Sequence, residues 1–344
     1  LAISVVLVGM LLGASTGIVG ATVVTMGLLS LPTMLKRGYQ PQLATGTIAA
    51  SGTLGQIIPP SIVLVLLGDI LGVSVGDLFM GAVFPGMLLV VLYIVYIAIY
   101  ARCRKDCAPL IPDEEWQEVL RKGLMRRIAK ALLPPLFLMV SVLGSIFAGV
   151  ASPTEAAAVG ATGALLLAIV NKRFHVTMLK QAMLTTTVLT CMVFIILVGA
   201  AAFGLVFRGL GGDHVIRDFI QSLHMGKWGV LALVMGLIFV VGCFLDFIEI
   251  TFIHIPVLAP IMVDFGFDPL WFGILFAVNL QTSFLTPPFG FSLFYLKGVA
   301  PPEIRTEHIY RGVLPFIVLQ LIGLLLVTFF PVLTTWLPRH VFTN

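Results

Sequence analysis

The stretch LPTMLKRGYQP (residues 31–41), followed by Pro59-Pro60, recurs 228 positions later as APIMVDFGFDP (residues 259–269), followed by Pro287-Pro288. The landmarks that repeat are proline and glycine residues, and most positions between them differ. These residue types determine backbone geometry, so the repeat indicates a duplicated bend pattern. Both copies lie in very apolar sequence. A duplicated pair of hydrophobic segments interrupted by Pro and Gly is typical of secondary transporters and marks their binding site.

The composition is that of a membrane protein. The 344 residues are 59% hydrophobic and 10% charged, and the mean hydropathy is +1.10, whereas soluble domains carry about 25% charged residues. Several apolar stretches exceed the roughly 20 residues that span a bilayer, which predicts an all-α polytopic protein embedded in lipid. The net charge of +4 is spread over loops, so we expect no nucleic-acid partner.

Two further motif classes are absent from the sequence. The four cysteines, Cys103, Cys107, Cys191 and Cys243, form no disulfide framework. Cys103 and Cys107 have a metal-like spacing but no second pair, so we expect no metal site there. The chain has no P-loop motif, so we do not expect this subunit to be driven by ATP.

The hydrophobic pattern predicts four regions. Residues 1–101 form a first repeat unit with a hairpin, a broken helix and a span, and symmetry predicts roughly 100 further residues of this unit before Leu1. Residues 102–130 form a cytoplasmic loop with an interfacial helix anchored by Trp116. Residues 131–226 supply the scaffold spans of the second unit, and residues 227–344 supply its hairpin, its broken helix and the last span.

The distribution of positive charge predicts the orientation. With residues 102–130 in the cytoplasm, sixteen of the twenty Lys and Arg residues fall on the cytoplasmic side, in agreement with the positive-inside rule. The first hairpin then opens inward and the second opens outward. The fold expected is an inverted repeat with two re-entrant hairpins and two broken helices.

The two breaks predict two cation sites. A broken helix exposes backbone groups that lipid cannot satisfy, and freed carbonyls with nearby hydroxyls suit Na⁺ or another hard cation. We expect the tip at Ser15, Thr16 and Gly17 to meet Ser51, Gly52, Thr53 and Gly55. We expect the tip from Phe244 to Asp246 to meet Thr282, Ser283 and Thr286. In the alternative interpretation these small residues only let helices pack closely.

Four polar residues, Ser51, Asn279, Gln281 and Glu249, are candidates for contact with a substrate. Asn279 and Gln281 precede the second Pro-Pro pair, and Ser51 and Thr53 are their counterparts in the first copy. The long amides would reach a substrate at the midplane or would hydrogen-bond between helices. Glu249 is an acid in an apolar hairpin, which is a functional candidate by default.

Two other acids have simpler interpretations. Asp246 would cap a half-helix or serve the transport site, and Glu155 would begin a helix after Ser152-Pro153. His254, five residues after Glu249, completes no known metal signature.

These motifs resemble a known family. GASTGIVGATVVTMGLLSLPTMLKRGY, ASGTLGQIIPPSIVLVLLG, VASPTEAAAVGA, FLDFIEITFIHIPVLAP and NLQTSFLTPPFGFSLFYLKGVAPPEI are similar to the large membrane (M) subunit of tripartite ATP-independent periplasmic (TRAP) transporters, with the last two closest to the mannitol/chloroaromatic-type branch. The resemblance implies a multi-pass protein of the bacterial cytoplasmic (inner) membrane. It also implies a small membrane (Q) subunit, a periplasmic substrate-binding protein, and sodium-driven uptake of a small organic anion by an elevator motion.

The resemblance also implies two sodium sites. The first would involve Thr16, Gly17, Gly52, Thr53 and Pro59. The second would lie near the 244–246 tip, with Thr282, Thr286 and Pro287.

The sequence departs from the family at three places. Its first tip has less serine than many members, which favours ligation there by backbone carbonyls. Phe247 stands where proline often follows the aspartate of the second tip. Glu249 and His254 replace apolar residues, and they bear on substrate choice.

Three other functions compete with sodium-coupled transport. Asp246 or Glu249 would couple transport to protons. An intramembrane enzyme would need a nucleophile–base pair, which the sequence does not offer, so we expect no enzymatic activity. A passive channel would have no need of paired hairpins.

Overall fold

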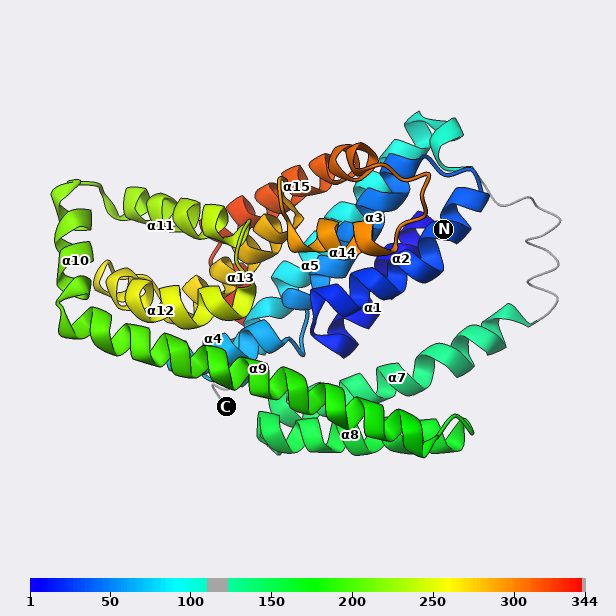
Figure 1. Cartoon of the computed structure of the whole chain (residues 1–344), viewed down its shortest axis with the longest axis horizontal. Helices are drawn as coiled ribbons and strands as arrows, with labels where there is room; N and C mark the ends of the chain where they lie inside the picture. The colour runs from blue at the N-terminus through cyan, green and yellow to red at the C-terminus, as the bar shows by residue number, and fades with distance from the viewer. Residues whose placement is uncertain (110–122, 342–344) are drawn as a thin grey trace. The chain divides into compact units, whose positions relative to one another are not determined.

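The computed structural model describes residues 1–109 and 123–341, and within these ranges every regular element is a helix (Figure 1). Seven of the described helices are long and apolar enough to cross a membrane. They are Val19–Lys36, Val75–Cys103, Ile128–Phe147, Pro153–Val170, Val176–Gly209, Phe247–Asp264 and Thr306–Phe329. The prediction of an all-α polytopic membrane protein is confirmed.

The helices repeat with the same offset as the sequence landmarks. The first copy contains α1 (Ala2–Thr16), α2 (Val19–Lys36), α3 (Pro41–Thr53), the 3₁₀ turn η1 (Leu54–Gln56), α4 (Ile62–Leu71) and α5 (Val75–Cys103). The second contains α11 (Lys227–Gly242), α12 (Phe247–Asp264), α13 (Pro269–Leu285), α14 (Phe291–Val299) and α15 (Thr306–Phe329). Helices α2 and α12 begin and end 228 residues apart. The inverted orientation of the two copies stays a prediction.

Proline and glycine set the repeated bends. Gly38 and Gly266 have φ values of 75° and 76°, a left-handed conformation that glycine adopts without steric cost and that commonly ends helices. Pro41 and Pro269 begin the next helices, where proline lacks only an N–H that would be unpaired anyway. The Pro59-Pro60 and Pro287-Pro288 peptide bonds are both cis.

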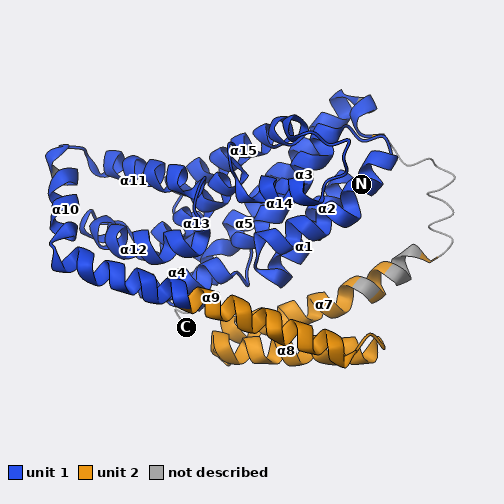
Figure 2. Cartoon of the chain, in the orientation of Figure 1, with its two compact units in different colours: residues 1–108, 195–344 blue, residues 109–194 orange. Residues whose placement is uncertain are grey.

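The chain divides into two compact units (Figure 2). Unit 1 comprises residues 1–108 and 195–344, and therefore both copies of the repeat. It also contains η2 (Lys105–Cys107), α10 (Gly212–Ser222) and α16 (Val332–Val341). Unit 2, residues 109–194, contains α7 (Leu124–Phe147), α8 (Pro153–Val170) and the first part of α9 (Val176–Gly209).

Within unit 2, α8 begins with a capping box. The Ser152 hydroxyl accepts a hydrogen bond from the Glu155 amide, and the Glu155 carboxylate accepts one from the Ser152 amide. This arrangement satisfies two amides that a helix start leaves unpaired. The prediction that Glu155 begins a helix is confirmed.

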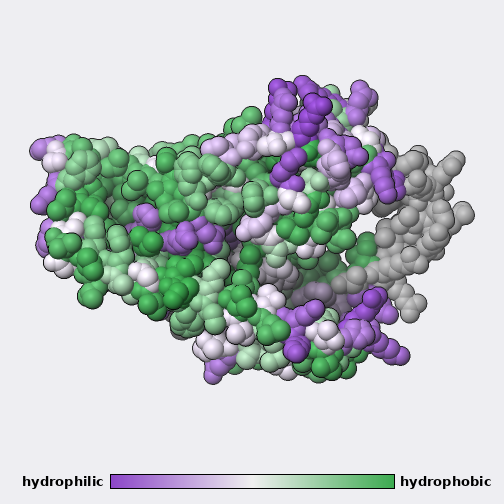
Figure 3. Space-filling view, viewed as in Figure 1, coloured by the Kyte–Doolittle hydropathy of each residue, from purple (hydrophilic) through white to green (hydrophobic). Residues whose placement is uncertain are grey.

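The two broken spans form the core of unit 1. Every residue of α3 from Leu43 and every residue of α13 from Trp271 is buried. The outer surface is apolar instead, and Figure 3 shows hydrophobic residues over much of the visible face. Apolar side chains on the outside and polar backbone breaks at the centre are the arrangement that a bilayer requires.

Some element boundaries differ from those predicted. The described part of the expected interfacial helix, from Leu124, continues into the span of α7, and Trp116 lies outside the described residues. The last predicted span is two helices, because α15 ends at Phe329 and α16 begins after Pro331. Residues 212–222, within the region expected to supply scaffold spans, form the short helix α10 of 11 residues. Helix α2 continues past Pro32 to Lys36.

Helix α3 crosses α15 at two glycines. A Cβ on Gly46 would collide with the Gly312 backbone, and a Cβ on Gly312 would collide with the Gln42 carbonyl. The two backbones therefore touch, which only glycine permits.

We expect Gly46→Ala to lower the free energy of unfolding by about 1–3 kcal/mol, because neither backbone has room to yield. Thermal melting of the purified protein in detergent would measure this change. Gly236→Ala on α11, where a Cβ meets nothing within 4 Å, is the control. Equal melting temperatures for the two variants would contradict the crossing.

Candidate functional site

The first break interrupts the core span between α3 and α4. The amides of Ile57 and Ile58 both donate to the Leu54 carbonyl, and the chain is not helical again until Ile62. Across the break, the Ser61 hydroxyl donates to the Gln56 carbonyl at 2.6 Å. Part of the freed backbone is thus satisfied from within the protein.

The second break is closed in the same way. Phe284 is the counterpart of Gln56 in the second copy, and its carbonyl accepts a hydrogen bond from the Ser292 hydroxyl at 3.1 Å. The Pro288 carbonyl accepts another from the Tyr310 hydroxyl at 2.7 Å. In both copies, therefore, a serine from the second half of the span binds the equivalent carbonyl of the first half.

Hairpin one packs against the first break through glycines. A Cβ on Gly13 would lie 2.8 Å from the Cα of Gly55, and a Cβ on Gly9 would lie 2.6 Å from the Cβ of Ser51. Gly17, at φ 64°, lies against Ile62 at the start of α4. The predicted meeting of tip and break occurs, but the closest contacts come from Gly9 and Gly13 of α1, which precede the tip.

The hydroxyls of the first tip point back into the hairpin. Ser15 and Thr16 both donate to the Leu12 carbonyl, and Thr16 also shares a 2.8 Å hydrogen bond with Thr22. Both residues are exposed. The structure therefore brings the backbone of this tip near the break without directing these two side chains into it.

Around the first break, Gly52 and Pro59 are buried. Gly52 packs against Val23 of α2, so it joins the broken span to the second helix of the hairpin. Ser51, also buried, donates its hydroxyl to the Ile48 carbonyl.

Hairpin two approaches the second break in a similar way. Gly242 at the end of α11 contacts Ser283, the counterpart of Gly55. The rings of Phe244 and Phe289 lie 5.4 Å apart between centroids. Both copies thus place a glycine of the first hairpin helix against equivalent positions of the broken span.

The polar residues of the second site stay within their own helices. Ser283 and Thr282 donate to the Leu280 and Val278 carbonyls, and Thr286 donates to the Thr282 carbonyl. Pro287 follows directly. Asp246 occupies the N-cap position of α12 but makes no capping hydrogen bond with its side chain, so only the position was predicted correctly.

The long amides of α13 bond to other helices. The Asn279 side chain donates to the Met235 carbonyl of α11 at 2.8 Å, and the Gln281 side chain donates to the Thr53 hydroxyl at 3.4 Å. The structure thus shows the interhelical bonds that were one of the two interpretations. Contact of these residues, or of the half-buried Glu249, with a substrate stays a prediction.

Two residues of this network were missed. Gln320 of α15 donates to Thr53 at 3.3 Å and to the Tyr93 hydroxyl of α5 at 2.7 Å. The signal was a single amide within the long apolar segment of α15, because polar residues in spans are expensive and are commonly functional.

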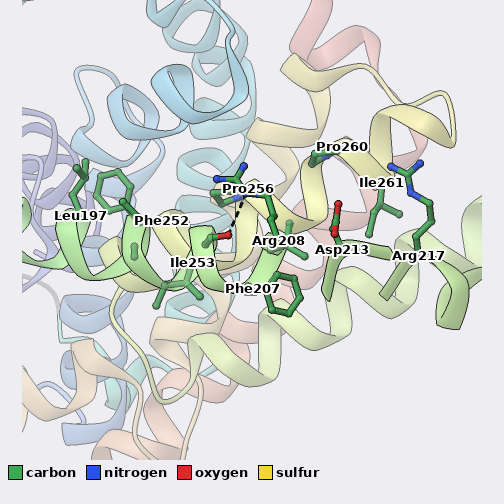
Figure 4. Close-up of a pocket in the computed structure, with 14 residues that line it drawn as sticks. Leu197, Phe207, Arg208, Asp213, Arg217, Phe252, Ile253, Pro256, Pro260 and Ile261 are labelled. Atoms are coloured by element: carbon green, nitrogen blue, oxygen red, sulfur yellow. Dashed lines mark hydrogen bonds between the residues drawn. The ribbon is translucent and has the colours of Figure 1, made fainter. Parts of the chain in front are cut away.

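A cavity of about 260 Å³ lies within unit 1 between α9, α10 and α12 (Figure 4). Arg208, Asp213 and Arg217 line it together with apolar residues of α9 and α12, and Arg217 forms a 2.8 Å ion pair with Asp264. None of the predicted site residues lines this cavity. Among the described residues, no three of the His, Cys, Asp and Glu side chains gather as a metal site.

The sequence matches a family of known proteins. Residues 1–333 match the family described as "Tripartite ATP-independent periplasmic transporter, DctM component". The chain is 33% identical over 341 residues to the C4-dicarboxylate TRAP transporter large permease protein DctM of Pseudomonas aeruginosa. The matched region covers 98% of this chain and 77% of that protein.

Other relatives carry different substrates in their names. The chain is 33% identical to the ectoine/5-hydroxyectoine large permease of Ruegeria pomeroyi, over 100% of this chain and 78% of that protein. It is 31% identical to the isethionate TRAP transporter permease protein DctMQ of Oleidesulfovibrio alaskensis, over 94% of this chain and 49% of that protein. On the family match over residues 1–333 and the DctM relatives, the chain belongs to the DctM family of TRAP transporter large permeases, which are multi-pass proteins of the bacterial inner membrane.

Proposed function

We propose that this chain is the transmembrane subunit of a sodium-coupled transporter that imports a small carboxylate or sulfonate. Uptake depends on a periplasmic substrate-binding protein and a small membrane subunit. The names of the relatives support an organic anion, since they include C4-dicarboxylate, isethionate, sialic acid and ectoine transporters. All four named compounds carry a carboxylate or a sulfonate group.

The observation that carries the proposal is the equivalence of the two breaks. In each copy a serine hydroxyl donates to the carbonyl at the equivalent position. In each copy a glycine of the hairpin also packs against the equivalent position of the broken span. Freed carbonyls at such breaks suit a cation, while half-helix N-termini suit an anionic group. Two equivalent breaks therefore supply two sodium sites, with a substrate between them.

The packing of unit 1 supports an elevator motion. Both hairpins and both broken spans belong to one compact unit, and the broken spans are buried within it. A unit that holds both sodium sites can carry ions and substrate together. Movement of the two hairpins and the two broken spans against the scaffold spans is the mechanism proposed.

The first test is uptake of radiolabelled carboxylates and sulfonates into proteoliposomes that contain the full complex and its binding protein. We expect uptake to require both an inward sodium gradient and the binding protein. An inside-negative potential should stimulate it, because each net positive charge gains roughly 2.3 kcal/mol per 100 mV. Uptake without the binding protein would contradict the tripartite mechanism.

We expect Thr286→Ala to raise the sodium concentration for half-maximal uptake about five-fold, the effect of losing one oxygen contact. Thr53→Ala should act in the same direction by loosening the end of α3 at the break, because the Thr53 hydroxyl is already fully hydrogen-bonded within the protein. Thr328→Ala on α15 removes a hydroxyl that bonds only to its own helix and is the control. An unchanged sodium requirement in both site variants would remove these residues from the sodium sites.

Proton coupling is the second candidate, because Asp246 and Glu249 lie close enough to interact electrostatically in the second hairpin. It predicts uptake that ignores sodium, rises at acid pH and is lost in Glu249→Gln. The same proteoliposomes under a pH gradient decide between the two couplings. Sodium-dependent uptake that survives in Glu249→Gln would exclude the proton mechanism through this residue.

A further inference from the structure

The two broken spans contact each other through a residue and its own counterpart. Thr53 is the last residue of α3, and Gln281 is the residue 228 positions later in α13. Their side chains share a hydrogen bond of 3.4 Å, and both are fully buried. When two copies are related by a two-fold rotation, only residues close to the axis contact their own counterparts. This pair therefore lies where the axis of the predicted inverted repeat would pass.

The helices that follow the breaks complete the contact. Gln320 of α15 donates one amide to both Thr53 and Tyr93 of α5, and α5 and α15 are themselves counterparts. The Tyr93 hydroxyl also lies close to Gln281 and Thr53. We call these four residues, Thr53, Tyr93, Gln281 and Gln320, the axis cluster.

Hydrogen bonds and ring packing hold the members of the axis cluster in place. The Thr53 hydroxyl donates to the Ala50 carbonyl at 2.9 Å and accepts from both amides, so its capacity is filled. The Tyr93 ring packs edge-on against Phe316 at 5.2 Å between centroids. Hydrogen bonds of this kind are strong in a low-dielectric interior.

The two glutamine side-chain oxygens of the cluster, by contrast, lower the stability of the fold. The side-chain oxygens of Gln281 and Gln320 are buried and have no hydrogen-bond partner among the described residues. A buried polar atom without a partner destabilises a fold, and apolar residues of similar volume would avoid that cost. Stability alone therefore does not account for two glutamines at the centre of unit 1.

We infer that Gln320 and Tyr93 are positioning residues that hold the two breaks in one arrangement. A change in the structure of either break therefore changes the structure of the other. The cluster binds the residue at which α3 ends and the turn of α13 that precedes Thr282 and Thr286. It is the one place among the described residues where side chains of all four helices share hydrogen bonds. The inference rests on the proposed function for its purpose, which is to couple the two sodium sites.

Hydrogen exchange measured by mass spectrometry on the complete complex in lipid nanodiscs tests the inference without sodium. Gln320→Met keeps the side-chain length and removes both hydrogen bonds, and Tyr93→Phe removes only one. In each variant we expect amides at both breaks, in residues 54–61 and 286–292, to exchange about five- to ten-fold faster, the effect of losing about one hydrogen bond. Peptides of α8 should not change.

The control is Thr47→Val on α3. It removes a hydroxyl that is as deeply buried as that of Thr53 but has no partner. The double variant of Gln320 and Tyr93 should exchange no faster than Gln320→Met, because both act through the same hydrogen bond. Faster exchange at only one break, at neither, or equally in Thr47→Val would overturn the inference.

Sodium is then added to the wild-type complex to separate this inference from the proposed function. Slower exchange at both breaks supports sodium sites there, and unchanged exchange refutes them. The sodium-free comparison of variants decides the axis cluster in either case. If Gln320→Met does not assemble, Tyr93→Phe, which keeps the ring contact with Phe316, gives the same comparison.

Discussion

The structure depends on one constraint: backbone groups freed inside a bilayer must be satisfied by the protein itself. Two helices end at mid-span, and each end exposes carbonyls that lipid cannot bind. The remaining features follow from this need. Serine hydroxyls close both breaks on equivalent carbonyls, glycines bring a hairpin helix into contact with each break, and the broken spans lie where no lipid reaches them. Carbonyls that are freed from helical hydrogen bonds in this way are also suited to a cation.

The sequence predicted what local residue types dictate, and it did not predict what distant packing dictates. Proline and glycine bend the backbone wherever they occur, so Gly38, Gly266 and the two Pro-Pro pairs located the breaks and the repeat correctly. Side-chain direction is different. The tip with Ser15 and Thr16 was expected to meet the first break, and its backbone does lie nearby. Both hydroxyls bond to the Leu12 carbonyl instead, because a hydroxyl in a helix readily binds the preceding turn. A single amide in an apolar segment marked Gln320, but its hydrogen bonds to Thr53 and Tyr93 form only when α3, α5 and α15 pack together, which no local pattern shows.

The two copies share bends but differ in the side chains that support them. The second break has the Tyr310 hydroxyl on its Pro288 carbonyl and the Asn279 amide on α11. Their counterparts in the first copy, Ala82 and Ser51, lack such groups. The first copy instead brings two glycine backbones together at Gly13 and Gly55. The two proposed sodium sites therefore have equivalent backbone geometry but unequal side-chain support, so they need not bind sodium equally.

The contact between Thr53 and Gln281 has a consequence for how such a chain arises by duplication. In two identical subunits, a residue on the symmetry axis meets a second copy of itself and must be its own partner. Two identical hydroxyl or amide groups can hydrogen-bond across the axis only when one group presents its donor to the acceptor of the other. Once both copies belong to one polypeptide, that restriction disappears, and one position can become a hydroxyl while the other becomes an amide. The centre of the fold is therefore where fusion of the two halves opens chemistry that no symmetric dimer can reach.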